Sequence, residues 1–151
     1  SNPEFTTNVL VAFARAAARL ASEKNFENRV KRFLKEQNCY FLKYWGGGEF
    51  TKAGVPDILC CCNGRFIGIE VKAKNGKPKP LQLWNLRKIE EAGGFGVLLY
   101  PDQWELFKNF IDCIQANDAN MYYNDSLLKR TRDEWEEKLK KEKKKKKGFF
   151  G

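Results

Sequence analysis

A two-residue turn signal, Asn63-Gly64, lies between two apolar runs of residues that favour β-strands. The pair supplies the two positive φ angles that a type I′ turn requires. Residues 54–72 are therefore predicted to form a β-hairpin. Counting outward from a two-residue loop places Asp57 opposite Glu70 on the neighbouring strand.

This register puts two carboxylates side by side. Directly opposed residues of an antiparallel pair have Cβ atoms about 5 Å apart on one face of the sheet, where like charges repel each other. Lys72 shares that face with Glu70 because strand side chains alternate. Mg²⁺ relieves such repulsion, since it prefers carboxylate, water and phosphate oxygens as ligands. Two interpretations remain open at this point: a metal site for phosphodiester chemistry, or a solvated hairpin face with incidental charges.

The same residues carry a family resemblance. Pro56-Asp57 followed by Glu70-Val71-Lys72 resembles the signature of PD-(D/E)XK nucleases. Residues 54–94 are more closely similar to the virus-type replication and repair nuclease domain (VRR-NUC), and the resemblance covers residues 26–100. It implies an α/β fold with an αβββαβ restriction-endonuclease-like core, in which helices flank a mixed central sheet. Extra helices are expected at both ends of the chain.

The resemblance also implies the metal ligands. Asp57, Glu70 and the Val71 carbonyl are expected to hold Mg²⁺ or Mn²⁺. An acid on the first core helix completes the site in this family, and Glu27 is the matching residue. Glu27 shares a helix face with Val30, so its side chain is expected to point toward the sheet. The alternative is a first-turn glutamate that the helix dipole favours.

Lys72 is implied to position or activate a water molecule, or to stabilise charge on the phosphate. Gln82, in the first turn of a predicted helix, is implied to hold phosphate or the catalytic water, unless it is an ordinary exposed helix residue. Basic residues of the nearby strand and loops are candidates for DNA binding; they are Lys43, Lys52, Lys74, Lys77 and Lys79.

The chain contains five cysteines and no histidine. Without histidine, Ser-His-Asp and Cys-His catalysis are excluded, as is every nuclease chemistry that uses a histidine base, so acid, lysine and metal remain. No CxxC pair is present, and a zinc site is therefore not predicted. Residues 60–62 are consecutive cysteines on a predicted strand, where they cannot all pair with one another. They are predicted to be small buried apolar residues in a reducing cytoplasm.

The net charge of +9 indicates a polyanionic partner. Residues 126–151 contribute +6 of it, with eleven Lys and Arg against five Asp and Glu. Nucleic acid is favoured over a membrane surface, because no apolar anchor accompanies the charge. No signal peptide or bilayer-spanning run is recognised, which predicts a cytoplasmic protein, in a bacterial host cell if the protein is viral.

Periodicity and capping residues predict the order of helices and strands. Asp102 and Glu105 form a predicted capping box, and Asn25 a predicted helix cap. The last strand follows a helix, so it is expected to pair in parallel with the strand before that helix. The predicted helices are 8–21, 26–37, 80–92, 103–117 and one from about 126 that frays at 143–147; the predicted strands are 39–45, the two hairpin strands and 95–100.

Three segments are predicted: 1–25, an expression-vector remnant (residues 1–5) with an amphipathic helix; 26–125, the nuclease domain; and 126–151, a basic helix and lysine-rich tail. The glycine-containing loop at 46–52 either admits substrate or only connects two strands.

The predicted function is that of a Mg²⁺- or Mn²⁺-dependent, structure-selective DNA endonuclease. Branched DNA such as Holliday junctions and a homodimer are implied by the resemblance, and no organic cofactor is expected. The alternatives are a nuclease for flap, nicked or ordinary duplex DNA, and a catalytically silent DNA-binding module.

Overall fold

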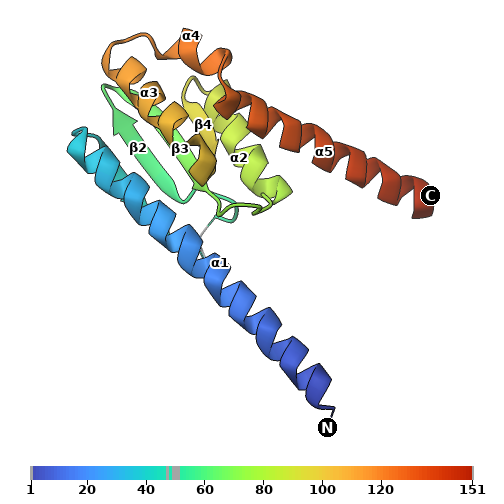
Figure 1. The fold of residues 1–151 in the computed structure, drawn as a ribbon. Helices are drawn as coiled ribbons and strands as arrows, with labels where there is room; N and C mark the ends of the chain where they lie inside the picture. The colour runs from blue at the N-terminus through green and yellow to red at the C-terminus, as the bar shows by residue number, and fades with distance from the viewer. Residues whose placement is uncertain (1, 47, 49–51, 151) are drawn as a thin grey trace.

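The structure of the chain is a computed structural model that describes residues 2–46, 48 and 52–150 (Figure 1). Its helices and strands follow the order α-β-β-β-α-β, with further helices after the last strand. Their bounds are α1 Pro3–Glu36, β1 Tyr40–Lys43, β2 Ile58–Cys62, β3 Arg65–Val71, α2 Pro80–Glu91, β4 Phe95–Leu99, the 3-10 helix η1 Pro101–Gln103, α3 Trp104–Gln115, α4 Ala119–Asn124 and α5 Leu127–Phe150.

The four strands form one mixed sheet in the order β1-β2-β3-β4. β1, β2 and β3 pair antiparallel, and β4 pairs parallel to β3 after the α2 crossover, as predicted. The hairpin is also confirmed: Asn63 and Gly64 have φ of 48° and 76°, and Ile58 pairs with Ile69. The protein is therefore an α/β protein whose mixed sheet is flanked by helices.

The helices pack on both faces of the sheet. α1, α3 and α4 cover one face and share the larger hydrophobic core with the strands. α2 and α5 cover the β3–β4 half of the other face, where Leu86 and Leu98 are fully buried. Every residue of β4 is buried, which fits the prediction of a strand covered on both faces. From α5, Leu128, Trp135 and Leu139 also pack against these cores.

Two glycines that pair across β3 and β4, Gly68 and Gly96, let α2 approach the sheet closely. A Cβ atom at Gly96 would lie 2.7 Å from the carbonyl carbon of Leu86 and even closer to its oxygen. One at Gly68 would collide with Ile89 of the same helix. Gly96 is therefore required, because its obstacle is helix backbone, whereas at Gly68 the end of the Ile89 side chain would have to shift.

Gly96→Ala is expected to destabilise the protein by about 3 kcal/mol, because the new methyl group meets helix backbone that cannot move aside as a side chain can. For a chain of this size the midpoint of thermal unfolding should fall by roughly 6–12 °C. Gly46→Ala is the matched control, since a Cβ there meets no described atom within 4 Å. Equal midpoints for the two variants would refute the close approach.

The predicted helices 8–21 and 26–37 are wrong as separate elements, because the structure has the single helix α1. Residues 22–25 contain neither glycine nor proline, so nothing ends the helix there. The helix begins after Asn2, whose Oδ1 accepts a hydrogen bond from the Glu4 N–H at 3.0 Å. Asn25 is therefore no cap, and residues 3–5 of the presumed vector remnant belong to the helix.

Smaller differences concern the ends of elements. Strand β1 spans four residues instead of the predicted seven. The predicted capping box is replaced by η1, and the cap residue Gln103 makes no side-chain hydrogen bond to the start of α3; its Nε2 donates to Thr131 Oγ1 at 2.7 Å instead. The short helix α4 was not predicted, and α5 stays helical through residues 143–147. The predicted loop at 46–52 falls mainly on residues 47 and 49–51, which lie outside the described residues.

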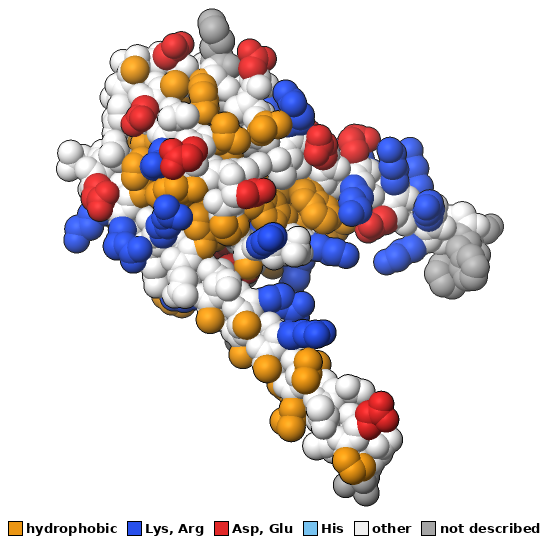
Figure 2. Space-filling model, in the orientation of Figure 1, with side chains coloured by type: hydrophobic (Ala, Val, Ile, Leu, Met, Phe, Trp, Pro, Cys, Tyr) orange, Lys and Arg blue, Asp and Glu red, His pale blue; other side chains and the backbone are white. Residues whose placement is uncertain are grey.

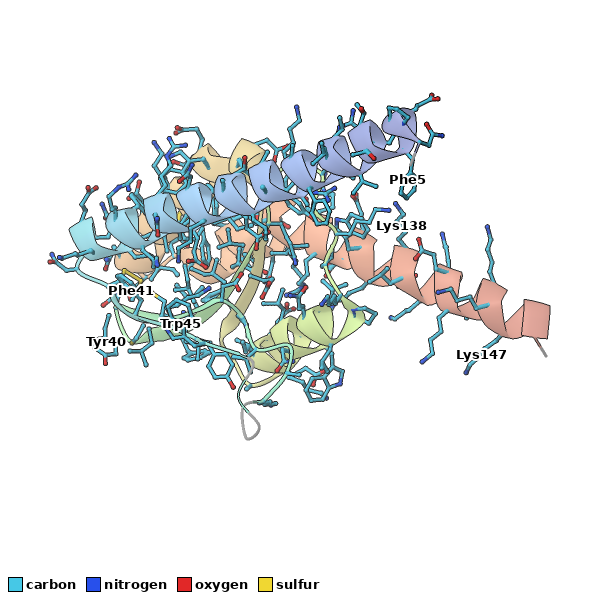
Figure 3. The ribbon with its side chains drawn as sticks, turned by 90° about the horizontal axis from the view of Figure 1, so that it is seen from below. Phe5, Tyr40, Phe41, Trp45, Lys138 and Lys147 are labelled. Atoms are coloured by element: carbon cyan, nitrogen blue, oxygen red, sulfur yellow. A yellow bond between two sulfur atoms is a disulfide. The ribbon has the colours of Figure 1, made fainter. Side chains whose placement is uncertain are left out.

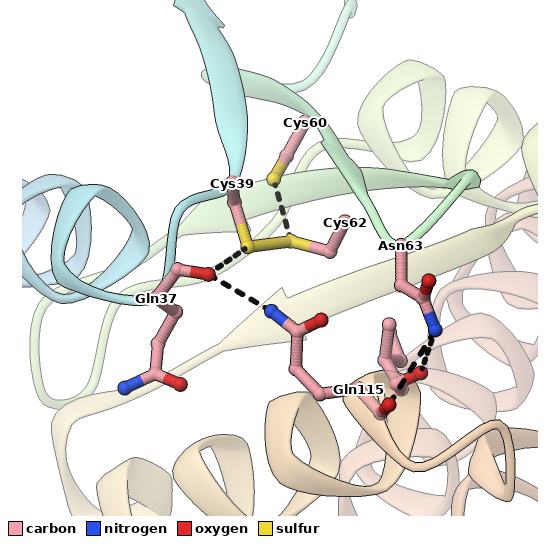
Figure 4. Close-up of a disulfide and its surroundings, with 7 residues drawn as sticks. Gln37, Cys39, Cys60, Cys62, Asn63 and Gln115 are labelled. Carbon is pink, nitrogen blue, oxygen red and sulfur yellow. Dashed lines mark hydrogen bonds between the residues drawn. A yellow bond between two sulfur atoms is a disulfide. The ribbon is translucent and has the colours of Figure 1, made fainter.

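The prediction that residues 60–62 are small buried apolar residues holds for Cys60 but is wrong for Cys61, which is exposed, and for Cys62, which is buried in a disulfide. Cys39 and Cys62 form a disulfide, with their Cα atoms 4.7 Å apart (Figure 4). Strand alternation explains the difference, since Cys60 and Cys62 point to the face where Cys39 lies and Cys61 points to the opposite face and is exposed. The Cys60 thiol lies 3.2 Å from Cys62 Sγ. Burial raises the pKa of Cys60 to about 12, so it is held as the inert thiol.

Two helices extend beyond the sheet. The N-terminal half of α1 projects from the fold, with apolar side chains along it, and the C-terminal half of α5 projects in another direction with its lysines exposed (Figures 1 and 2). Phe5, Phe13 and Leu20 are each about two-thirds exposed or more. None of the helices in the described part of the chain is both long enough and apolar enough to span a membrane.

Candidate metal centre

The predicted carboxylate pair forms where the hairpin strands end. Ile58 pairs with Ile69, so Asp57 stands one step beyond the last pair, next to Glu70. The Val71 N–H donates a hydrogen bond to Asp57 Oδ2 at 2.9 Å. In a regular ladder a backbone carbonyl would accept a bond of this kind, and here the Asp57 side chain accepts it instead. The bond holds the Asp57 carboxylate at the end of β3.

Glu70 is the most buried acid of this group, with 2% of its surface exposed. Gln82 Nε2 donates to its Oε1 at 2.9 Å, and Lys72 Nζ lies 3.7 Å from the same oxygen. The other oxygen, Oε2, is buried and has no hydrogen-bond partner among the described residues. Burial and the neighbouring Asp57 carboxylate raise the pKa of Glu70 to about 9, against the opposing effect of Lys72. A buried carboxylate with a free oxygen is a strong candidate for an oxygen ligand of a hard cation.

The positions of Lys72 and Gln82 are determined by neighbouring elements. The Lys72 N–H donates to Leu99 O of β4 at 2.9 Å, which extends the parallel pairing by one residue. Gln82 Oε1 accepts a hydrogen bond from the Lys79 N–H at 2.8 Å, at the start of α2. Because this bond orients the Gln82 amide, its Nε2 is directed at Glu70. The structure thus brings together Asp57, Glu70, Lys72 and Gln82 as predicted.

Glu27 points toward the sheet as predicted, with 5% of its surface exposed. It forms ion pairs with Lys24 at 3.2 Å, with Lys31 at 3.3 Å and, most closely, with Lys43. Lys43 also lies 3.6 Å from Asp57 Oδ1 and so joins the two acids. Although burial alone would raise the pKa of Glu27, its hydrogen bonds with Lys43 and Lys24 lower it. Three lysines therefore already neutralise this carboxylate.

A second acid of α1, Glu23, faces the same site and was missed in the sequence. It lies one helical turn before Glu27 and is half-buried. Burial raises the pKa of Glu23, while Lys72 lowers it and Asp57 raises it further. These influences place Glu23 in the electrostatic field of the carboxylate pair. The i, i+4 spacing from Glu27 could have revealed it, but the predicted break at Asn25 separated the two residues.

The predicted DNA-binding lysines have different surroundings. Lys74, Lys77 and Lys79 are exposed on the segment between Lys72 and α2, where the Tyr100 hydroxyl donates to Gly76 O at 2.7 Å. Lys52 lies over the Trp84 ring on α2, 5.6 Å from its centroid. The Lys43 side chain is only 19% exposed and is paired with acids, so its main contacts are within the site. Four of the five lysines are thus exposed, and three of these lie on the segment that follows Lys72.

A comparison with models of known protein families finds no match for this chain, and a comparison with curated proteins finds none either. The chemistry must therefore be argued from the site itself. Asp57, Glu70, Lys72 and Gln82 lie together at the end of the hairpin, and Lys43 links Asp57 to Glu27, so the atoms available to a ligand are oxygen and nitrogen. Among the described residues, the cysteine cluster of Cys39, Cys60 and Cys62 lies toward the other end of the hairpin and includes a disulfide, so it offers this site no thiolate.

Proposed function

We propose that this protein is a divalent-metal-dependent DNA endonuclease of the VRR-NUC type, with the restriction-endonuclease-like αβββαβ core. The observation that carries the proposal is the pair Asp57 and Glu70. Two adjacent carboxylates, one of them buried with an unpartnered oxygen, are costly to a fold unless a cation binds them. A lysine from the same strand, Lys72, stands beside them. The resemblance in residues 54–94 supports the same conclusion.

The donor set fits a hard cation. Asp57, Glu70 and the Val71 carbonyl would hold Mg²⁺ or Mn²⁺, with Glu23 or Glu27 contributing from α1 directly or through water. Glu23 is the better candidate, because Glu27 is already neutralised by three lysines. The metal would supply a bound water of lowered pKa and neutralise charge on the scissile phosphate.

The protein groups have separate tasks in this proposal. Gln82 holds one oxygen of Glu70, so the other oxygen stays free for a ligand. Lys72 is an ammonium with three donors, which can hold the attacking water or a phosphate oxygen. Because its Nζ lies 3.7 Å from Glu70, it also favours the ionised form of that carboxyl and lowers its pKa, against the effects of burial and of Asp57.

The choice of DNA rests on charge. The net charge is +9, and Lys74, Lys77 and Lys79 are exposed on the segment that follows Lys72 of the proposed site. Lysines at this position can contact the phosphates that flank a cleaved bond. Further lysines on the projecting part of α5 would add phosphate contacts that do not depend on sequence. Branched DNA as the substrate and a homodimer rest on the resemblance.

The test is a cleavage panel in which sequence is constant and shape varies: a four-way junction, a flap, a nicked duplex and a continuous duplex. Mg²⁺ or Mn²⁺ should support cleavage of the junction, and a chelator should prevent it. Cleavage of every shape at equal rates would reject structure selectivity but not the nuclease. Binding of DNA without cleavage in either metal would reject the nuclease and indicate a silent DNA-binding module.

A further inference from the structure

An exposed tryptophan stands beside the proposed metal centre and has no role in it. Trp45 follows strand β1, and 71% of its surface is exposed. The labelled side chains in Figure 3 show where Trp45 lies relative to Tyr40 of β1. Indoles are large apolar groups that proteins usually bury at least in part. An indole exposed to this degree next to a group of acids suggests a ligand with an aromatic surface.

The backbone ties this tryptophan to the metal centre. The N–H of the preceding residue, Tyr44, donates to Asp57 O at 2.9 Å. The Tyr44 hydroxyl donates to Lys52 O at 3.1 Å. Trp45 is therefore one residue away from a direct hydrogen bond to a predicted metal ligand, and its position relative to that ligand is well defined.

Two lysines connect the indole with the acids. Lys24 Nζ and Lys43 Nζ lie 5.5 Å and 5.6 Å from the Trp45 ring centroid, and both form ion pairs with Glu27. Lys43 Nζ is also 3.6 Å from Asp57 Oδ1. A single ammonium group thus separates the ring from the Asp57 carboxylate. Since phosphates of one DNA strand follow each other every ~3.4 Å along a stacked helix, the ring lies within a few nucleotides of a phosphate at the metal centre.

We propose that Trp45 is a stacking platform for an unpaired DNA base close to the scissile phosphate. The proposal rests on the proposed nuclease function and narrows its substrate class. A base inside a continuous duplex is stacked on both sides and must be extruded before it can lie on a protein ring. An unpaired base at a junction, flap or gap meets no such cost, and its π-face can stack on an aromatic side chain whatever its sequence.

The lysines fit this occupant. The Lys24 side chain is 51% exposed, so its ammonium can leave the ring and contact a phosphate when a base takes its place. Lys43 stays between the indole and Asp57, where it can contact the backbone phosphate that links the stacked nucleotide to the cleaved one. The site therefore provides an aromatic surface for the base and positive charge for the phosphates on either side.

The chain also contains a matched control. Trp84 on α2 is 48% exposed, and Lys52 and Lys88 lie 5.6 Å and 5.5 Å from its ring centroid. Its chemistry is nearly the same as that of Trp45. However, Lys88 pairs with Glu91 and not with an acid of the metal centre. A general loss of aromatic surface or of nearby charge would affect both tryptophans, whereas stacking beside the metal centre requires Trp45 alone.

The test compares Trp45→Ala, Trp45→Phe and Trp84→Ala with the wild type. Binding is measured by fluorescence anisotropy in Ca²⁺ on a duplex with a short single-stranded gap and on the same duplex fully paired. Loss of a stacked base costs about 1–3 kcal/mol, so Trp45→Ala should bind the gapped DNA roughly 5- to 150-fold more weakly. Its affinity for paired DNA should not change. Trp45→Phe should recover part of the loss, and Trp84→Ala should resemble the wild type on both DNAs.

Equal losses on gapped and paired DNA, or equal losses for Trp45→Ala and Trp84→Ala, would overturn the proposal. So would a change in the sedimentation mass of Trp45→Ala, which would assign the indole to a contact with a second copy of the chain. If Trp45→Ala unfolds at a lower temperature than the wild type, Trp45→Phe serves as the control for stability, because it keeps an aromatic ring at this position.

Because these measurements need no cleavage, they are separate from the nuclease test. If Trp45→Ala loses affinity for gapped DNA alone but the wild type cuts no DNA, stacking is supported and the nuclease is rejected. If Trp45→Ala binds gapped DNA like the wild type and the wild type cuts DNA, the nuclease is supported and stacking is rejected.

Discussion

Replacing Glu70 with glutamine is expected to lower metal-dependent cleavage by about 10²–10³-fold or more, the scale on which loss of one charge-stabilising group acts in enzymes. Glutamine keeps the size of the side chain and can still bond with Gln82. It removes the negative charge that the cation needs as a ligand. Single-turnover cleavage of the preferred DNA at saturating protein measures the effect, and Glu105→Gln, at a side chain that is 79% exposed, is the control. Full activity of Glu70→Gln would reject the metal centre.

The same substitution should change how the stability of the metal-free protein depends on pH. The pKa of Glu70 is raised from 4.5 to about 9 in the folded protein. Between these values the folded state binds a proton that the unfolded state has lost. This contribution to stability is therefore complete below about pH 4.5 and is lost as the pH rises toward 9, by at most about 1.4 kcal/mol per pH unit.

In Glu70→Gln this part of the pH dependence should disappear, and the variant should be more stable than the wild type at pH 8.5 in the presence of a chelator. Denaturant unfolding at pH 6 and at pH 8.5 gives the comparison. The wild type should also bind Mg²⁺ more tightly at the higher pH, because the metal displaces the proton. Identical slopes of stability against pH in the two proteins would show that Glu70 is ionised in the metal-free fold.

The second large effect is expected at Arg132, the largest side chain that is fully buried. Its NH1 donates to Gly96 O at 3.0 Å and to the Tyr123 hydroxyl at 3.3 Å. It forms ion pairs with Glu90, Asp133 and Glu136. One guanidinium thus joins helix α5 to helix α2 and to strand β4 of the sheet.

Arg132→Ala should cost about 3–5 kcal/mol, because it leaves a cavity and removes the shared partner of three partly exposed acids and of the buried Gly96 carbonyl. The unfolding midpoint should fall by roughly 6–20 °C for a chain of this size. Arg87 and Lys129 still pair with Glu90, which favours the lower end of this range. The exposed Arg130→Ala is the control. Thermal unfolding with equal midpoints for both variants would show that the α5 network contributes nothing to stability.

Local sequence determined the central hairpin. Asn63 and Gly64 adopt the positive φ angles that their turn type requires, and the register follows by counting residues. Asp57 and Glu70 therefore come together through contacts between neighbours in the sequence. The parallel pairing of β4 was also predictable, since a helix between two strands of one sheet leaves few other arrangements.

Interactions between distant segments decided the rest, and the sequence carries only weak signals for them. Cys39 reaches Cys62 because strand β1 pairs beside β2, and Arg132 is buried because α5 folds back on the sheet. The acids of α1 show the reason most clearly. The helical spacing of residues shows which of them share a face. It does not show whether the helix is continuous or which acid on that face contacts the sheet. Packing of α1 along the sheet surrounded Glu27 with lysines and left Glu23 in the field of Asp57 and Lys72, because those partners come from strands far along the chain.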